Sequence, residues 1–163
     1  MIDNIAQRGC RSGCCVSMVG DVYVFLATGA ETNGAYFLMD GIVPPGGGPP
    51  LHVHSREDEA FYVAAGEFEI EYGERTQRLG PTGFVHCRRG VAHRFRNVGT
   101  QPGRLLQMFT PAGIEQFFYA AGTEVAGADA EPLPVTPADI ERLLLAAAEH
   151  GIEIRLPEGD HHG

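Results

Sequence analysis

The sequence predicts an all-β domain, an antiparallel sandwich or small barrel, followed by one or two short C-terminal helices. Short runs rich in β-branched and aromatic residues recur along the first two thirds of the chain, each bounded by Gly, Pro or Asn. The 22 Gly and 11 Pro imply many turns between short strands. A chain of 163 residues is about one domain. We therefore expect a single domain over residues 1–163, with a barrel core at about 16–122 and a connector and helix at about 123–163.

The expected strands follow one another with little between them. The first two cover 16–27 and 35–43, where β-branched and aromatic residues dominate. A Gly/Pro loop at 44–50 follows. Beyond it, six shorter runs are expected as strands: 51–54, 59–65, 67–72, 83–87, 93–98 and 104–110. The junction at Gly66 predicts a hairpin turn.

Helical spacing replaces strand spacing after residue 112. Three apolar residues recur at helical intervals: Ile114, Phe117 and Phe118. They predict a short helix that packs on the barrel and ends near Gly122. Thr136 is a good N-cap, with Pro137 at the first helical position and Asp139 three residues after the cap. A second helix is therefore expected from there to about His150.

Net charge and cysteine content indicate which partners and which cellular compartment to expect. Twelve Lys and Arg against 21 Asp and Glu give a net charge of −9, the wrong sign for binding a phosphate backbone. Neither a run of about 18 apolar residues nor an export signal is present, so we expect no membrane partner and a cytoplasmic location. The cysteines do not resemble a secreted disulfide framework, and reduced thiols are expected. They are Cys10, Cys14, Cys15 and Cys87.

Four residues predict a metal site inside the barrel. His52 and His54 are two apart on an expected strand, so their side chains project from one face. Glu59 begins a strand whose residues of equal parity are apolar, which predicts that its carboxylate points inward. His93 opens another strand with the same pattern. A single histidine on a half-buried strand is more often a hydrogen-bonded core or surface residue. Three imidazoles and a carboxylate together, however, suit a divalent first-row metal with open coordination positions.

Two groups of residues at characteristic spacing carry a resemblance to a known family. The first group is Gly46, His52, His54, Glu59 and Gly66; the second is Gly90, His93 and Asn97. Over roughly residues 20–122 the chain resembles a single-domain cupin, specifically the small proteins similar to quercetin dioxygenase. Two positions depart from the second motif, Thr82 where the family has Gly and Arg88 where it has Pro. Neither position supplies a ligand.

The resemblance implies a cupin jelly-roll barrel in which His52, His54, Glu59 and His93 surround one metal ion. It suggests iron, manganese, nickel, cobalt, copper or zinc, and mixed nitrogen and oxygen ligands disfavour magnesium and calcium. It also implies a homodimer. Strand edges of an open jelly roll need cover, which the helix at about 137–150 or the N-terminal strand would provide across a two-fold interface.

The leading hypothesis is a metal-dependent oxygenase that acts on an aromatic or enolic substrate in the barrel. Glu59 is then the catalytic base, which takes a proton from a substrate hydroxyl. Phe61, Val63 and Phe95 are expected to line the pocket, and His86 is a further substrate-binding candidate if it points inward. Two alternatives stay open: a non-redox isomerase, cyclase or decarboxylase with the same ligands, and a ligand-binding cupin without catalysis.

Overall fold

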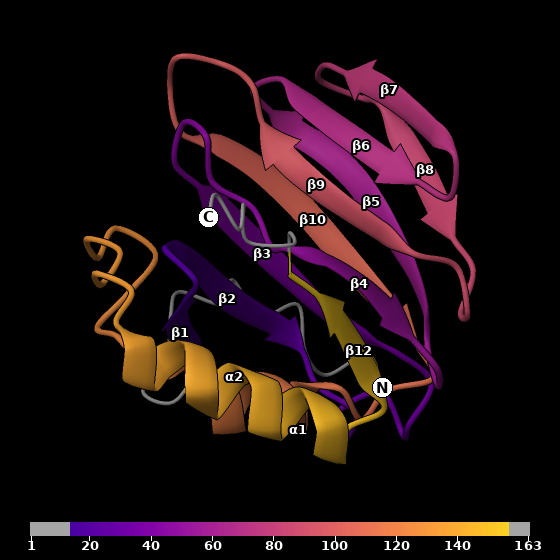
Figure 1. The fold of residues 1–163 in the computed structure, drawn as a ribbon, viewed down its shortest axis with the longest axis vertical. Coiled ribbons are helices and arrows are strands. Elements are labelled where there is room, and N and C mark those ends of the chain that lie inside the picture. The colour runs from indigo at the N-terminus through magenta and orange to yellow at the C-terminus, as the bar shows by residue number, and fades with distance from the viewer. Residues whose placement is uncertain (1–13, 157–163) are drawn as a thin grey trace, which may run out of the picture.

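Two antiparallel β-sheets that face each other form the body of the molecule, as a computed structural model of residues 14–156 describes it (Figure 1). One sheet has seven strands in the order β11-β1-β2-β3-β10-β5-β8, and the other has five in the order β12-β4-β9-β6-β7. The seven strands are β11 (Thr123–Glu124), β1 (Cys15–Met18), β2 (Asp21–Ala27), β3 (Phe37–Val43), β10 (Gly103–Thr110), β5 (Asp58–Ala65) and β8 (Phe84–Cys87). The five are β12 (Ile152–Arg155), β4 (Leu51–His54), β9 (His93–Asn97), β6 (Phe68–Tyr72) and β7 (Arg75–Leu79). The predicted all-β jelly roll with short C-terminal helices is confirmed.

The expected strand at 16–27 is in fact a hairpin. Met18 pairs with Asp21, so Val19 and Gly20 form a two-residue turn in which both residues have positive φ, 49° and 86°. Positive φ at both central positions is what such a turn requires, and it is unusual for a β-branched residue. The other expected strands begin and end within two residues of their predicted bounds. The hairpin expected at Gly66 is wrong, because β5 and β6 belong to different sheets.

Three strands of the structure were not predicted from the sequence. β7 is an edge strand with four exposed residues at its start, and β11 has two residues. β12 lies beyond the predicted barrel core, yet it completes the five-stranded sheet. There Ile152 pairs with His54, and Ile154 pairs with His52.

Two helices lie across one end of the sheets (Figure 1). α1 (Glu115–Ala121) and α2 (Pro137–Glu149) pack against each other, and α2 begins with the predicted capping box between Thr136 and Asp139. Neither helix in the described range has the length and apolar character of a membrane span.

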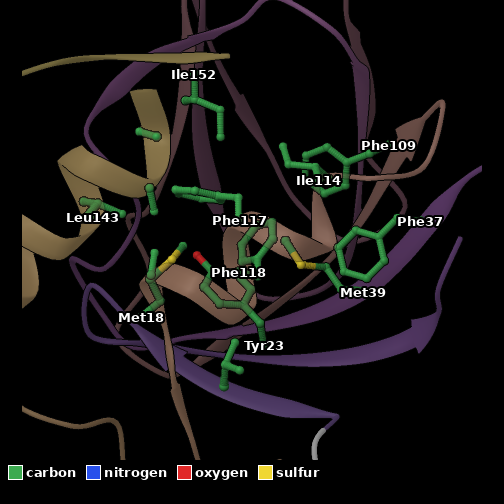
Figure 2. Packing of buried hydrophobic residues seen from close by; sticks show 14 of the residues in the cluster. Met18, Tyr23, Phe37, Met39, Phe109, Ile114, Phe117, Phe118, Leu143 and Ile152 are labelled. Atoms are coloured by element: carbon green, nitrogen blue, oxygen red, sulfur yellow. The ribbon is translucent and has the colours of Figure 1, made fainter. Parts of the chain in front are cut away.

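The apolar interior consists of two clusters. One gathers around the helices and contains Met18, Tyr23, Phe37, Phe109, Phe117, Phe118, Leu143 and Ile152 among others (Figure 2). The other contains Val43, Phe61, Val63, Phe68, Ile70, Cys87, Phe95 and Leu105. Imidazole rings contact both clusters: His54 lies 5.7 Å from Phe109 and His93 lies 6.0 Å from Phe61, between ring centroids. A polar layer therefore separates the two apolar regions.

The cysteines agree only in part with the expectation of reduced thiols. Cys14 and the buried Cys87 are free. The expectation is wrong for Cys15, which is disulfide-bonded. Cys10 lies outside the described residues.

Candidate metal centre

The four predicted ligands come from three strands and meet in the polar layer. His52 and His54 lie on β4, His93 lies directly opposite His52 on β9, and Glu59 comes from β5 of the facing sheet. One potential ligand atom from each of the four residues lies within 4.8 Å of all the others. His52 is 9% exposed and the other three are 3% exposed or less. Strand alternation in two facing sheets thus brings together residues that the chain separates by up to 41 positions, from His52 to His93.

Oε2 of Glu59 is at the centre of this group. It lies 2.8 Å from Nε2 of His93, 3.1 Å from Nε2 of His54 and 4.0 Å from Nε2 of His52. Hydrogen bonds to the backbone fix the orientation of two of the rings. Nδ1 of His52 donates to the carbonyl of Pro50 at 2.8 Å, and Nδ1 of His93 donates to the carbonyl of Val91 at 3.0 Å. Such outer hydrogen bonds direct the Nε2 atom of a histidine toward a metal.

His54 supplies the test of whether a metal fits. Both of its ring nitrogens are buried and, among residues 14–156, neither has an aligned hydrogen bond, although Nε2 is only 3.1 Å from Glu59. Leaving a buried polar group unsatisfied costs about 1–3 kcal/mol. A cation shared with the neighbouring nitrogens would satisfy Nε2. The donor set therefore fits one divalent first-row metal ion.

Electrostatics favour the metal-binding ionisation states of Glu59 and His52. Burial raises the pKa of Glu59, but the close approach of His54 and His93 outweighs that effect and holds the pKa at about 2. Burial, together with the neighbouring His54 and His93, lowers the pKa of His52 to about 3. At neutral pH the site thus offers an ionised carboxylate and a neutral His52, both in metal-binding form.

Glu57 is a buried residue near the site that the sequence reasoning missed. It is 5% exposed, its Oε2 lies 3.9 Å from Nδ1 of His54, and burial raises its pKa. Neither of these two atoms has a hydrogen bond within the described part of the chain. The only sequence signal is an acidic residue three positions after His54.

A mainly apolar cavity of about 40 Å³ lies beside the candidate ligands. His52, His54 and Glu59 are among the residues that line it. The surrounding side chains include Tyr23, Phe109, Phe117, Phe118, Leu143 and Ile152, which gather in Figure 2. The site therefore combines metal-ligating groups with an adjoining cavity lined mainly by apolar side chains.

The residues predicted to line the pocket lie elsewhere. Phe61, Val63 and Phe95 are buried in the second cluster, and within the described range the cavity is lined by other residues. Strand parity predicts which face is inward, but not the depth along the barrel, and these three lie beyond the site. The side chain of His86 is 52% exposed and lies 3.6 Å from Asp58, so it is a surface residue. Its neighbour Cys87 occupies the inward position.

The departure from the second motif at Thr82 preserves the shape of the turn. Thr82 adopts φ of 71°, the left-handed conformation that a glycine would take easily. Its amide donates to the carbonyl of Val63 at 2.9 Å, and Gly83 donates to Gly80 across the turn. Asn97 ties its own turn, since Nδ2 donates to the carbonyls of Val43 and Gln101.

Comparison with protein families and curated proteins gives two matches. Residues 40–109 match the family model described as a cupin domain. The chain is also 34% identical over 89 residues to Protein SchB of Streptomyces halstedii, an alignment that covers 53% of this chain. It spans 63% of the length of SchB.

Solved structures share the fold at low identity. KdgF from a Halomonas species aligns with a TM-score of 0.54 and 20% identity, covering 59% of this chain and 83% of that one. A predicted oxalate decarboxylase from Thermotoga maritima aligns with a TM-score of 0.55 and 21% identity, covering 64% and 99%. These likenesses concern the fold, and the site must be judged on its own residues.

Proposed function

We propose that this chain, which belongs to the cupin superfamily, is a metal-dependent enzyme that oxygenates an aromatic or enolic small molecule. One observation carries the proposal: three imidazoles and a carboxylate converge beside a mainly apolar cavity. A purely structural metal site has no need of an adjoining cavity, whereas a catalytic one needs an open position and space for substrate.

His52, His54, Glu59 and His93 would hold the ion. When bound, a divalent first-row cation supplies Lewis acidity and open coordination positions for substrate and oxygen. The three imidazoles are neutral donors, so Glu59 supplies the one formal negative charge among the four ligands. The outer hydrogen bonds of His52 and His93 keep their rings in place during turnover.

Glu59 is the proposed base. Its carboxylate faces the cavity, and its low pKa depends on the close approach of His54 and His93. Movement away from these partners removes that stabilisation and raises its proton affinity inside a buried site. A substrate hydroxyl that approaches through the cavity then gives its proton to Oε2, which leaves an electron-rich enolate or phenolate.

Aromatic side chains support the substrate class. Phe109 lies edge-on to Phe118 with ring centroids 6.0 Å apart, and Phe117 lies edge-on to Phe118 at 5.3 Å. Flat substrates pack well against ring edges and faces, and these side chains also keep water from the reacting atoms.

Oxygen uptake tests the proposal. Metal-free protein is loaded in parallel with iron, manganese, nickel, cobalt, copper or zinc and mixed anaerobically with a flavonol or a catechol, and air is then admitted. We expect oxygen consumption with at least one redox-active metal. Glu59→Gln should abolish turnover, whereas His86→Gln, which changes an exposed histidine outside the site, should leave it intact. Absence of uptake with every metal and both substrate classes would overturn the oxygenase assignment.

The same assay separates the two alternatives. Conversion of substrate without oxygen in the zinc-loaded protein would indicate Lewis-acid chemistry, such as isomerisation, cyclisation or decarboxylation. Ligand binding that Glu59→Gln preserves, with no turnover under any condition, would indicate a binding protein.

A further inference from the structure

Gln107 is a polar residue among apolar ones on the inward face of β10. Its neighbours on that face, Leu105 and Phe109, belong to the two apolar clusters. Gln107 itself is 2% exposed and lines the cavity beside the metal ligands. Buried amides are normally hydrogen-bonded, because burying an unpaired amide costs free energy through the loss of its hydrogen bonds to water. A glutamine in this position therefore needs a partner.

The protein does not supply that partner for Nε2. This atom is buried and has no hydrogen bond to any residue between 14 and 156. Tyr23 also lines the cavity, but its hydroxyl donates to Oδ2 of Asp21 at 3.0 Å and is thus already engaged. Gln107 therefore places an unpaired amide donor in the wall of the cavity.

The fold makes room for this amide at a particular place. Gly41 of β3 lies beside it, and a Cβ at that position would come within 2.7 Å of Nε2. On β5, Phe61 pairs with Gln107 and Glu59 pairs with Phe109, so Gln107 and Glu59 are diagonal neighbours on one face. Diagonal neighbours on a sheet lie roughly 7–8 Å apart, a distance that one small aromatic molecule can span.

We infer that Gln107 is a specificity-determining residue whose Nε2 donates a hydrogen bond to a hydroxyl or carbonyl oxygen of the substrate, at an edge away from the metal ligands. This inference rests on the proposed function and narrows its substrate class to aromatic compounds that carry a second oxygen substituent. A site built to pair with a polar group rejects the analogue that lacks it.

A pair of probes that differ in one hydroxyl tests the inference. The affinities of 2-naphthol and naphthalene are measured by fluorescence titration with the full-length protein, both metal-free and zinc-loaded. The variants are Gln107→Met and Gln107→Leu, which keep the side-chain volume and remove the amide. The matched control is Gln77→Met, the same change at an exposed glutamine of β7.

We expect the preference for 2-naphthol over naphthalene to fall about tenfold in both Gln107 variants, the effect of one hydrogen bond. Naphthalene affinity should stay within about twofold of wild type, and Gln77→Met should change neither value. The thermal midpoint of Gln107→Met should hold or rise, because an unpaired buried amide is removed. A structural hydrogen bond of Gln107 would instead lower the midpoint.

Two results would overturn the inference in different ways. If both probes bind and their affinity ratio is the same in wild type and the Gln107 variants, Gln107 does not select substrate, while the aromatic cavity of the proposed function stands. If neither probe binds wild-type protein, the apolar cavity does not accept aromatic molecules, and the proposed substrate class fails with the inference.

Discussion

Asp21 makes the stability of this protein depend on pH in an unusual direction. Its side chain is fully buried on β2, where Oδ2 accepts the hydroxyl of Tyr23 and Oδ1 has no hydrogen bond to the described residues. Burial raises the pKa of Asp21 from 3.8 to about 7, although hydrogen bonds from Tyr23 and the backbone of Gly48 oppose the rise. The folded protein therefore prefers the protonated acid.

The sign and size of the effect follow from proton linkage. Between pH 3.8 and about 7 the folded state holds a proton that the unfolded state has lost, so the free energy of unfolding falls as pH rises. The stabilisation is fully present below pH 3.8 and is lost as pH passes about 7. A difference of about three pH units, at 1.36 kcal/mol each, corresponds to roughly 4 kcal/mol.

Replacement of Asp21 by asparagine isolates this contribution. Urea unfolding of metal-free wild type, Asp21→Asn and the control Asp129→Asn is measured from pH 4 to pH 8. Asp129 is an exposed aspartate, so its variant controls for the loss of one negative charge. The difference between Asp21→Asn and wild type should shift by about 3–4 kcal/mol in favour of the variant across this range. A difference that is constant with pH would refute the reasoning.

Four further substitutions have expected outcomes. Thr82→Gly should raise the free energy of unfolding in urea by about 1 kcal/mol, because Thr82 holds a left-handed conformation; a decrease would contradict this. Thr136→Ala should lower the free energy of unfolding by about 1 kcal/mol through loss of the α2 cap. An unchanged value would show that the cap does not stabilise the protein. Leu143→Ala should lower the free energy of unfolding by about 2–4 kcal/mol, since Leu143 is buried against the cavity. His93→Ala should weaken metal binding by about 100-fold or more in a competition titration with a coloured chelator; wild-type affinity would remove His93 from the ligand set.

The metal-ligand candidates were predictable because strand geometry is local. Residues two apart on a strand share a face, so His52 and His54 had to point the same way. The apolar residues of equal parity after Glu59 placed that carboxylate inside. The structure brings these three side chains and His93 together, as the motif spacing predicts. The homodimer and the cytoplasmic location stay predictions.

The pocket was not predictable from the same rules. Parity treats Glu59, Phe61 and Val63 alike, since all three face inward. Their depth along the barrel depends on how the two sheets and the helices pack, which no local pattern encodes. The result is that Phe61 and Val63 lie in the second cluster, while Phe109 and Phe117 reach the cavity.

β12 illustrates why the cavity was the part of the structure least predictable from the sequence: it depends on long-range contacts. Ile152 and Ile154 alternate with charged residues, as in a half-buried strand, but four residues are too few to identify one. Its partner β4 lies about a hundred positions earlier, and pairing requires α2 to bring the chain back across the barrel. Residues 40–109 contain the family match and all four candidate ligands, whereas α1, α2 and β12 contribute much of the cavity. The motif therefore predicts where a metal ion would bind, and the C-terminal segment contributes much of the adjoining cavity surface.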